Sequence, residues 1–109
     1  MSMWEEGPGP ASDCPVERTM AVIGAKWTML VLRDLMAGPK RFGQLLHSLR
    51  GISPTTLTQR LRSLEREGVC ARHAYAEIPP RVEYHLTPKG EALAAIIEAM
   101  RVWGERFGD

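Results

Sequence analysis

The feature that most constrains this chain is a very short link, Gly51-Ile52, between two amphipathic helical patterns. Apolar residues before the link recur with the spacing of one helix face, which predicts a short helix over about 41–49. After the link, Ser53 can cap a helix and Pro54 suits its first position, so a second helix is expected up to Gly68. The apolar positions of the two helices are Phe42, Leu45, Leu46 and Leu49, then Leu57, Leu61 and Leu64. Two helices joined so tightly form a helix-turn-helix.

Directly after this unit the periodicity changes from helical to alternating. Residues 69–75 and 81–86 alternate along the chain, and Ile78-Pro79-Pro80 lies between them. Alternation on both sides of a proline-containing loop predicts two short strands in a hairpin. A hairpin that follows a helix-turn-helix is a wing, so the sequence predicts a winged helix.

Three more helices are expected around this unit. The first runs from Pro15 to Gly24, and the second runs from about Ala25 to Ala37. The last begins at Thr87-Pro88 and is expected to be one continuous helix over about 88–107. The apolar stripes of these helices are Val16, Met20 and Ile23; Trp27, Leu30, Val31 and Leu35; and Leu93, Ile96, Ile97, Met100, Trp103 and Phe107. The fold class is therefore mainly α with a β-hairpin wing.

The last helix carries more apolar surface than a small core can cover. The chain has 109 residues, the length of one domain. We therefore expect Ile97, Met100, Trp103 and Phe107, with part of the first helix, to pack against the same surfaces of a second copy. The predicted organisation is a flexible tail over 1–13, rich in glycine and proline, and one domain over 14–109 that includes this dimerisation helix.

The net charge of +1 conceals a basic segment. Residues 38–73 contain seven basic and two acidic residues, and the rest of the chain is acidic overall. This distribution favours a polyanionic partner for the middle of the chain; the alternative is that the basic residues only solvate the helix pair. No apolar run could span a bilayer and the N-terminus lacks the features of a signal peptide, so a cytoplasmic protein with no membrane partner is expected.

The outer face of the helix that starts at Pro54 carries groups that can read double-stranded DNA. A major groove admits one helix, and hydroxyl and amide groups pair with its base edges. Thr55, Thr56 and Gln59 are expected to face base edges, because they lie away from the leucine stripe. The basic residues assigned to the same interface are Lys40, Arg41, Arg60 and Arg62, of which the last two are expected at phosphates. The alternative is a polar face that only keeps the helix soluble.

The loop between the strands is the predicted wing tip. Pro79 and Pro80 stiffen this loop and would hold Arg81 out from the hairpin. An arginine in that position can enter the minor groove or hold a phosphate. The alternative is a surface arginine that pairs with Glu77 or Glu83.

Cys14 is the one residue with a predicted reactivity. It stands where the first helix begins, beside N–H groups whose partial positive charge favours a thiolate, and Arg18 lies one turn further on. Cys14 is therefore a candidate sensor of oxidants or electrophiles, with an inert cap residue as the alternative. Cys70, in the first strand, is expected to be a buried small apolar residue.

The sequence gives no sign of catalysis or of a cofactor. His47, His73 and His85 are scattered, and neither cysteines nor carboxylates accompany them with metal-ligand spacing. No nucleophile–base set, phosphate-binding loop or carboxylate pair stands out. We therefore expect neither an enzyme nor a metal protein.

Four segments together resemble the HxlR family of bacterial winged-helix transcriptional regulators, relatives of the MarR type. They are CPVE at 14–17, GAKWTMLVLRDLMAGPKRFGQL at 24–45, GISPTTLTQRLRSLEREGV at 51–69 and PPRVEYHLTPKG at 79–90. In this order they are highly specific and cover nearly everything from Cys14 to Gly90. The C-terminal helix with Trp103 also fits the dimerisation helix of the family.

The resemblance implies a homodimer that binds an operator of two inverted half-sites. Some members respond to electrophiles, quinones, aldehydes or oxidants through the cysteine that corresponds to Cys14. Thr55 stands where the family often has a lysine or similar basic residue, so the resemblance implies no base preference here. It also places no resolving cysteine, which leaves a Cys14–Cys70 disulfide as one alternative.

A DNA-binding regulator therefore competes with one other function, a winged-helix module that binds an acidic protein. Protein-binding hot spots favour large aromatic anchors. The outer face of the 54–68 helix has none, which favours the DNA-binding function.

Overall fold

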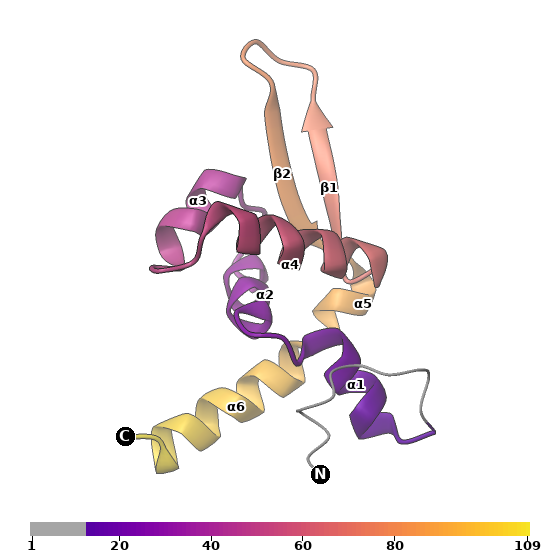
Figure 1. Cartoon of the computed structure of the whole chain (residues 1–109), viewed down its shortest axis with the longest axis vertical. Coiled ribbons are helices and arrows are strands. Elements are labelled where there is room, and N and C mark those ends of the chain that lie inside the picture. The colour runs from indigo at the N-terminus through magenta and orange to yellow at the C-terminus, as the bar shows by residue number, and fades with distance from the viewer. Residues whose placement is uncertain (1–12) are drawn as a thin grey trace.

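A computed structural model of the chain describes residues 13–109, so the expected tail over 1–13 lies, apart from Asp13, outside the described residues. The elements in order are α1 Pro15–Ile23, α2 Thr28–Met36, α3 Phe42–Ser48, α4 Pro54–Arg66, β1 Cys70–Tyr75, β2 Arg81–Leu86, α5 Pro88–Glu91 and α6 Ala94–Phe107. Figure 1 shows the hairpin standing at one end of the molecule, with α1 and α6 at the other. The predicted fold class, a mainly helical winged helix with a C-terminal helix, is confirmed.

The helix-turn-helix of α3 and α4 forms as the local signals predict. Ser53 is the N-cap of α4, and its Oγ accepts a hydrogen bond from the backbone N–H of Thr56 at 3.1 Å. Pro54 occupies the first helical turn, where its missing N–H costs nothing. Gly51 adopts a φ of 96° in the turn, a conformation that favours glycine. These caps set the start of α4, and with it the face that each side chain occupies.

The core lies where α2, α3 and α4 meet. The buried leucines are Leu32, Leu35, Leu45, Leu49, Leu57, Leu61 and Leu64. Burying one such side chain stabilises a fold by about 1.5–3 kcal/mol. The predicted stripes of α3 and α4 thus supply five of these seven leucines, with Phe42 and Leu46 packed at the edge of the core.

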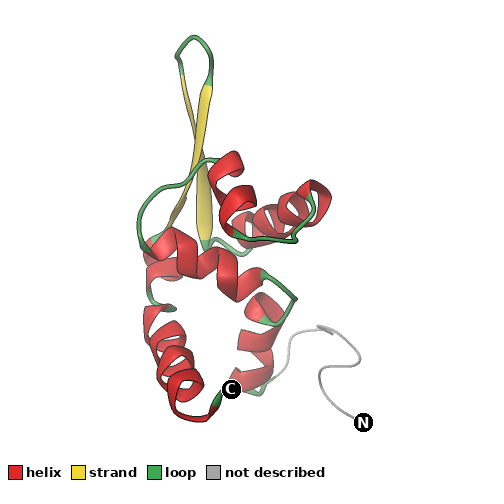
Figure 2. Ribbon diagram, turned by 90° about the vertical axis from the view of Figure 1, so that its left-hand side faces the viewer, coloured by secondary structure: helices red, strands yellow, loops and turns green. Residues whose placement is uncertain are grey.

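The wing is a two-stranded antiparallel hairpin whose pairing runs from Cys70 opposite Leu86 to Tyr75 opposite Arg81. Lys40, in the link between α2 and α3, makes an isolated β-bridge on the side of β2 away from β1: its N–H donates to the Tyr84 carbonyl at 2.9 Å and its carbonyl accepts from the Tyr84 N–H at 2.8 Å. The hairpin projects well beyond the helices, as Figure 2 shows. Its base is therefore bound to the helix-turn-helix, while its tip is distant from the core.

The expected start of α2 at about Ala25 is wrong, because α2 begins at Thr28. Trp27 has a φ of 79°, in the left-handed region that costs a residue with a side chain about 1–2 kcal/mol. The inner face of α2 is consequently formed by Thr28, Val31, Leu32 and Leu35. Leu30, expected on that face, is 40% exposed.

The single helix expected over 88–107 is also wrong, because the chain turns between α5 and α6 at residues 92–93. Two hydrogen bonds tighten this turn, from the Leu93 N–H to the Gly90 carbonyl and from the Ile96 N–H to the Leu93 carbonyl, both at 3.0 Å. Gly90 is buried so closely against the Val69 backbone that a Cβ there would clash with the Val69 carbonyl oxygen. This close packing holds α5 at the base of the wing and leaves α6 to take its own direction.

The contact at Gly90 predicts a large difference between two glycine substitutions. Gly90→Ala should lower the free energy of unfolding by about 1–3 kcal/mol, because the wing base must move to admit the methyl group. Gly43→Ala, in α3, meets nothing within 4 Å and should raise it by up to about 1 kcal/mol. Urea unfolding of both variants checks this; equal stability of the two would contradict the described approach of α5 to the wing.

Candidate nucleic-acid interface

The solvent-facing side of α4 is polar and basic. Thr55, Gln59, Arg62 and Arg66 are exposed on it, whereas the leucines of the opposite side are buried. Thr55 and Gln59 thus lie on the face that the sequence predicts, at the N-terminal half of the helix. Their hydroxyl and amide groups are available to a partner that approaches this face.

Thr56 differs from the other two residues expected at base edges. It is partly buried, and its Oγ1 accepts a hydrogen bond from the Ser53 hydroxyl at 2.9 Å. Its backbone N–H is also held by Ser53. The structure therefore gives Thr56 a part in the helix cap, which a helical-wheel argument does not reveal.

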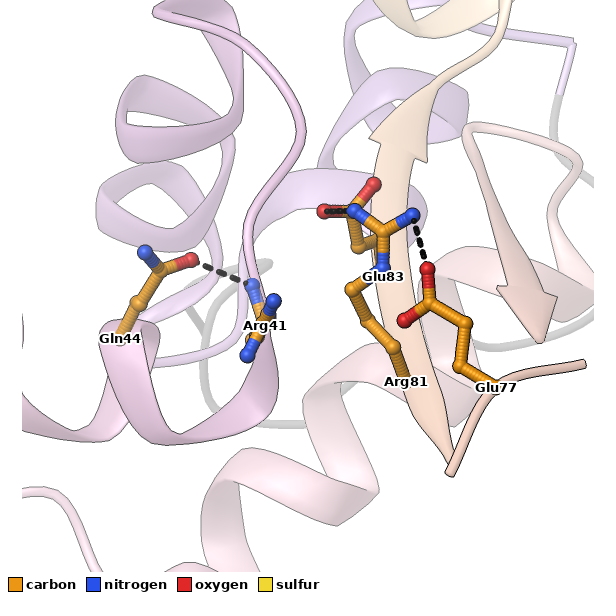
Figure 3. Close-up of polar contacts among 5 residues, drawn as sticks. All are labelled: Arg41, Gln44, Glu77, Arg81 and Glu83. Carbon is orange, nitrogen blue, oxygen red and sulfur yellow. Dashed lines mark hydrogen bonds and ion pairs between the residues drawn. The ribbon is translucent and has the colours of Figure 1, made fainter. Parts of the chain in front are cut away.

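The start of α3 brings Lys40 and Arg41 next to the wing. Arg41 is exposed and is the N-cap residue of α3, and its backbone N–H donates to Gln44 Oε1 at 2.8 Å (Figure 3). The backbone of Lys40 is fixed by its pairing with Tyr84. The backbone of both residues is thus held in place by hydrogen bonds. Gln44, which accepts one of these bonds, is not among the predicted site residues.

Arg60 is engaged inside the protein. Its Nε donates to the backbone carbonyl of Lys26 at 2.7 Å, across 34 positions of the sequence. A phosphate contact, as expected for Arg60, would therefore use a guanidinium whose Nε–H already donates to a backbone carbonyl. No local pattern signals this contact, because it depends on how α4 packs beside the link between α1 and α2.

At the wing, Arg81 forms ion pairs with both Glu77 and Glu83, which is the alternative to an arginine held out from the hairpin. Its Nη2 lies 3.1 Å from Glu77 and its Nη1 lies 3.3 Å from Glu83 (Figure 3), and its guanidinium carbon lies 3.7 Å from the centre of the Tyr75 ring. The side chain is only 27% exposed. The residue that stands out fully exposed at the tip is Ile78. DNA contact by Arg81 stays a prediction, and it would require a carboxylate to release the guanidinium.

An apolar surface lies at the opposite end of the molecule. Met100, Trp103 and Phe107 are more than half exposed on α6, and Val16 is equally exposed on α1. The Trp103 and Phe107 rings lie 5.5 Å apart. Ile97 packs partly against the core, so three of the four residues expected at a dimer contact are left largely uncovered.

The two cysteines occupy different environments. Cys14 is exposed at the N-cap position of α1, whereas Cys70 is buried, with its Sγ 3.9 Å from the Leu61 carbonyl oxygen. Burial raises the pKa of the Cys70 thiol to about 12, and the neighbouring Glu65 carboxylate acts in the same direction. No disulfide joins Cys14 to Cys70. Cys70 is thus the buried apolar residue that the sequence predicts.

Residues 13–109 lack two further features that would point to other functions. No group of three or more His, Cys, Asp and Glu side chains in this part of the chain could hold a metal ion. None of its helices is long and apolar enough to cross a membrane.

A polar recognition helix, a tight turn before it and a wing after it define a winged-helix protein with a helix-turn-helix. Residues 22–109 match the family described as HxlR-like helix-turn-helix, and the chain belongs to this family. The resemblance found in the sequence is therefore confirmed.

Known proteins similar to this chain are described as regulators. An uncharacterized HTH-type transcriptional regulator of Synechocystis sp. is 47% identical over 91 residues, which are 84% of this chain and 67% of the relative. The redox regulator HypR in its reduced form superimposes with a TM-score of 0.84 at 40% identity, covering 88% of this chain and 95% of HypR. The reduced form of the transcriptional regulator YodB from Bacillus subtilis gives 0.76 at 35% identity, covering 88% and 95%.

The raised pKa of Cys70 predicts a loss of stability at alkaline pH. The unfolded thiol loses its proton above about pH 9 and the folded thiol only near 12, so the unfolded state binds fewer protons in between. The free energy of unfolding of the wild type, measured against that of Cys70→Ala, should therefore fall as the pH rises from 9 to 10.5. Urea unfolding at several pH values checks this, and parallel profiles of the two proteins would contradict it.

Proposed function

We propose that the chain is a dimeric transcriptional regulator that binds double-stranded operator DNA, with α4 in the major groove. The observation that carries this proposal is the exposed face of α4, where Thr55 and Gln59 precede Arg62 and Arg66 on a helix capped at Ser53. Hydroxyl and amide groups pair with base edges, and arginines hold phosphates. Membership of a helix-turn-helix family supports the same function.

The charge distribution supports DNA as the partner. The basic segment over 38–73 includes α3 and α4, and its exposed cations are Arg41, Arg50, Arg62, Arg66 and Arg72. Such a segment attracts phosphates and accelerates association at low salt. The acidic ends of the chain lie outside this segment, so the attraction acts on the part of the protein that contains α3, α4 and the start of β1.

The apolar surface of α1 and α6 supports a twofold dimer. A surface with an exposed tryptophan, phenylalanine and methionine is unusual on a monomer, and a second copy related by a twofold axis would cover it. Two copies joined there would present two α4 helices, for which one turn of DNA requires a separation of about 34 Å. Each helix would then read one of two inverted half-sites.

We also propose that Cys14 makes the regulator responsive to oxidants or electrophiles. Cys14 is exposed at the start of α1, two positions before the exposed Val16. The description of HypR as a redox regulator supports this proposal. Because Cys70 is buried, the partner of an oxidised Cys14 would be Cys14 of the second copy or a thiol of low mass.

Two substitutions on α4 separate base reading from phosphate binding. Gln59→Ala should cost about 1–3 kcal/mol of binding to DNA from upstream of the protein's own gene and relax sequence preference. Arg62→Ala should weaken binding to all duplexes alike and lower the salt dependence by about one contact per subunit. Mobility-shift titrations at several salt concentrations distinguish the two, and loss of specific binding alone in both variants would refute this assignment.

A charge on α6 should separate the dimer. Trp103→Glu places a carboxylate at the centre of the apolar surface and should yield a folded monomer at micromolar concentration, where the wild type is a dimer. Ile78→Glu makes the same change at the wing tip, at the other end of the molecule (Figure 1), and should stay dimeric. Light scattering measures both; a monomeric wild type would contradict the proposed dimer.

Modification of Cys14 should change operator binding. Diamide, which oxidises thiols to disulfides, or a quinone should shift the operator affinity of the wild type by about 5- to 150-fold, the usual range for coupling between two sites. Cys14→Ser should not respond, and mass spectrometry should find the modification on Cys14. An equal response of both proteins, or of neither, would leave Cys14 as an inert cap residue.

A further inference from the structure

The link between α1 and α2, residues 24–27, is attached to the recognition helix. Arg60, on α4, donates its Nε hydrogen to the Lys26 carbonyl at 2.7 Å. The carbonyls on either side, of Ala25 and Trp27, accept the backbone N–H groups of Thr28 and Val31 at 3.2 and 3.0 Å. The Lys26 carbonyl thus accepts from the Arg60 side chain, whereas its two neighbours accept from backbone N–H groups at the start of α2.

The same link makes a second attachment, to the turn before α4. Trp27 holds a left-handed backbone conformation with a φ of 79° and packs against the core. A Cβ on Gly51 would lie 3.7 Å from Cη2 of the Trp27 ring, so the ring lies directly beside the turn. A bulky residue keeps such a conformation only where its surroundings hold it, and such residues cluster at functional and switch segments.

We propose that Arg60 is a positioning residue, which together with Trp27 holds α4 in a fixed orientation relative to α1. The link 24–27 follows α1 directly, and α1 carries Cys14 and part of the apolar surface. A shift of α1 would therefore reach α4 through the Arg60–Lys26 bond and reach the turn through Trp27. This inference rests on the proposed function, since it concerns how the dimer sets the separation of two recognition helices.

The proposal replaces the phosphate contact expected for Arg60. A residue that binds phosphate contributes a charge, which lysine can also supply. A residue that holds the Lys26 carbonyl with its Nε contributes a hydrogen bond in one geometry. The donor of a lysine lies one atom further along the side chain, so it does not reproduce that geometry. The two roles therefore predict different behaviour of Arg60→Lys, and different effects on salt dependence and on half-site spacing.

The test uses a duplex that the wild-type protein selects from a random-sequence pool, and a second duplex with one base pair inserted between the half-sites. The insertion should lower wild-type affinity by about 10-fold or more, because one extra base pair moves the second half-site along and around the helix. Arg60→Met and Arg60→Lys should lose less than about 3-fold on the insertion, since their recognition helices reorient. Both should keep the wild-type salt dependence on non-specific DNA.

Arg62→Met is the matched control, the same change on an exposed arginine two positions further on. It should keep the wild-type penalty for the insertion and lower the salt dependence. The proposal is overturned if Arg60→Met behaves like Arg62→Met, or if Arg60→Lys restores wild-type behaviour.

Amide hydrogen exchange gives a readout that needs no DNA. In Arg60→Met and Arg60→Lys, the amides of Thr28 and Val31 should exchange faster than in the wild type, while those of β1 and β2 should not change. Unchanged exchange at residues 24–31 would overturn the proposal even if DNA binding is found. A wild type that selects no duplex, with faster exchange in both variants, would refute the proposed function and leave the attachment of α4 intact.

Discussion

Burial of the leucines of α4 is the interaction on which the rest of the structure depends. Leu57, Leu61 and Leu64 are buried in one core cluster with leucines of α2 and α3, and no other rotation of α4 about its own axis would bury all three. Because this packing fixes the rotation of the helix, it also determines that Thr55 and Gln59 face solvent. Packing of the hydrophobic core thus determines which residues of α4 are exposed to a partner, and no further interaction is needed to orient the polar face.

Most of the fold could be predicted from the sequence because its signals are local. Ser53-Pro54 and Thr87-Pro88 mark helix starts by side-chain capping and a fixed φ, and alternation after Gly68 marks the strands. The errors arose where tertiary contacts override a local pattern. Trp27 leaves its expected helix because its ring packs beside Gly51, and the last helix breaks because Gly90 is pressed against Val69.

The candidate site divides in the same way. Exposure of Thr55, Gln59 and Arg62 follows from helical spacing and was predictable. The partners of Arg60 and Thr56 were not, because a hydrogen bond to a distant carbonyl or to a neighbouring cap leaves no periodic trace. For Arg81, Glu77 and Glu83 were identifiable as candidates, but only the pairing of Tyr75 with Arg81 across the hairpin shows how closely that side chain is held.

The β-bridge between Lys40 and Tyr84 of the wing bears on how such a protein can respond to a signal. Because the link before α3 is hydrogen-bonded in both directions to Tyr84, a movement of β2 would strain its attachment to the helix-turn-helix. This attachment favours a helix-turn-helix and a wing base that move together as one unit. In a dimer of this chain, a signal would therefore change the distance between two such units and their relative orientation, while the shape of each unit stays the same.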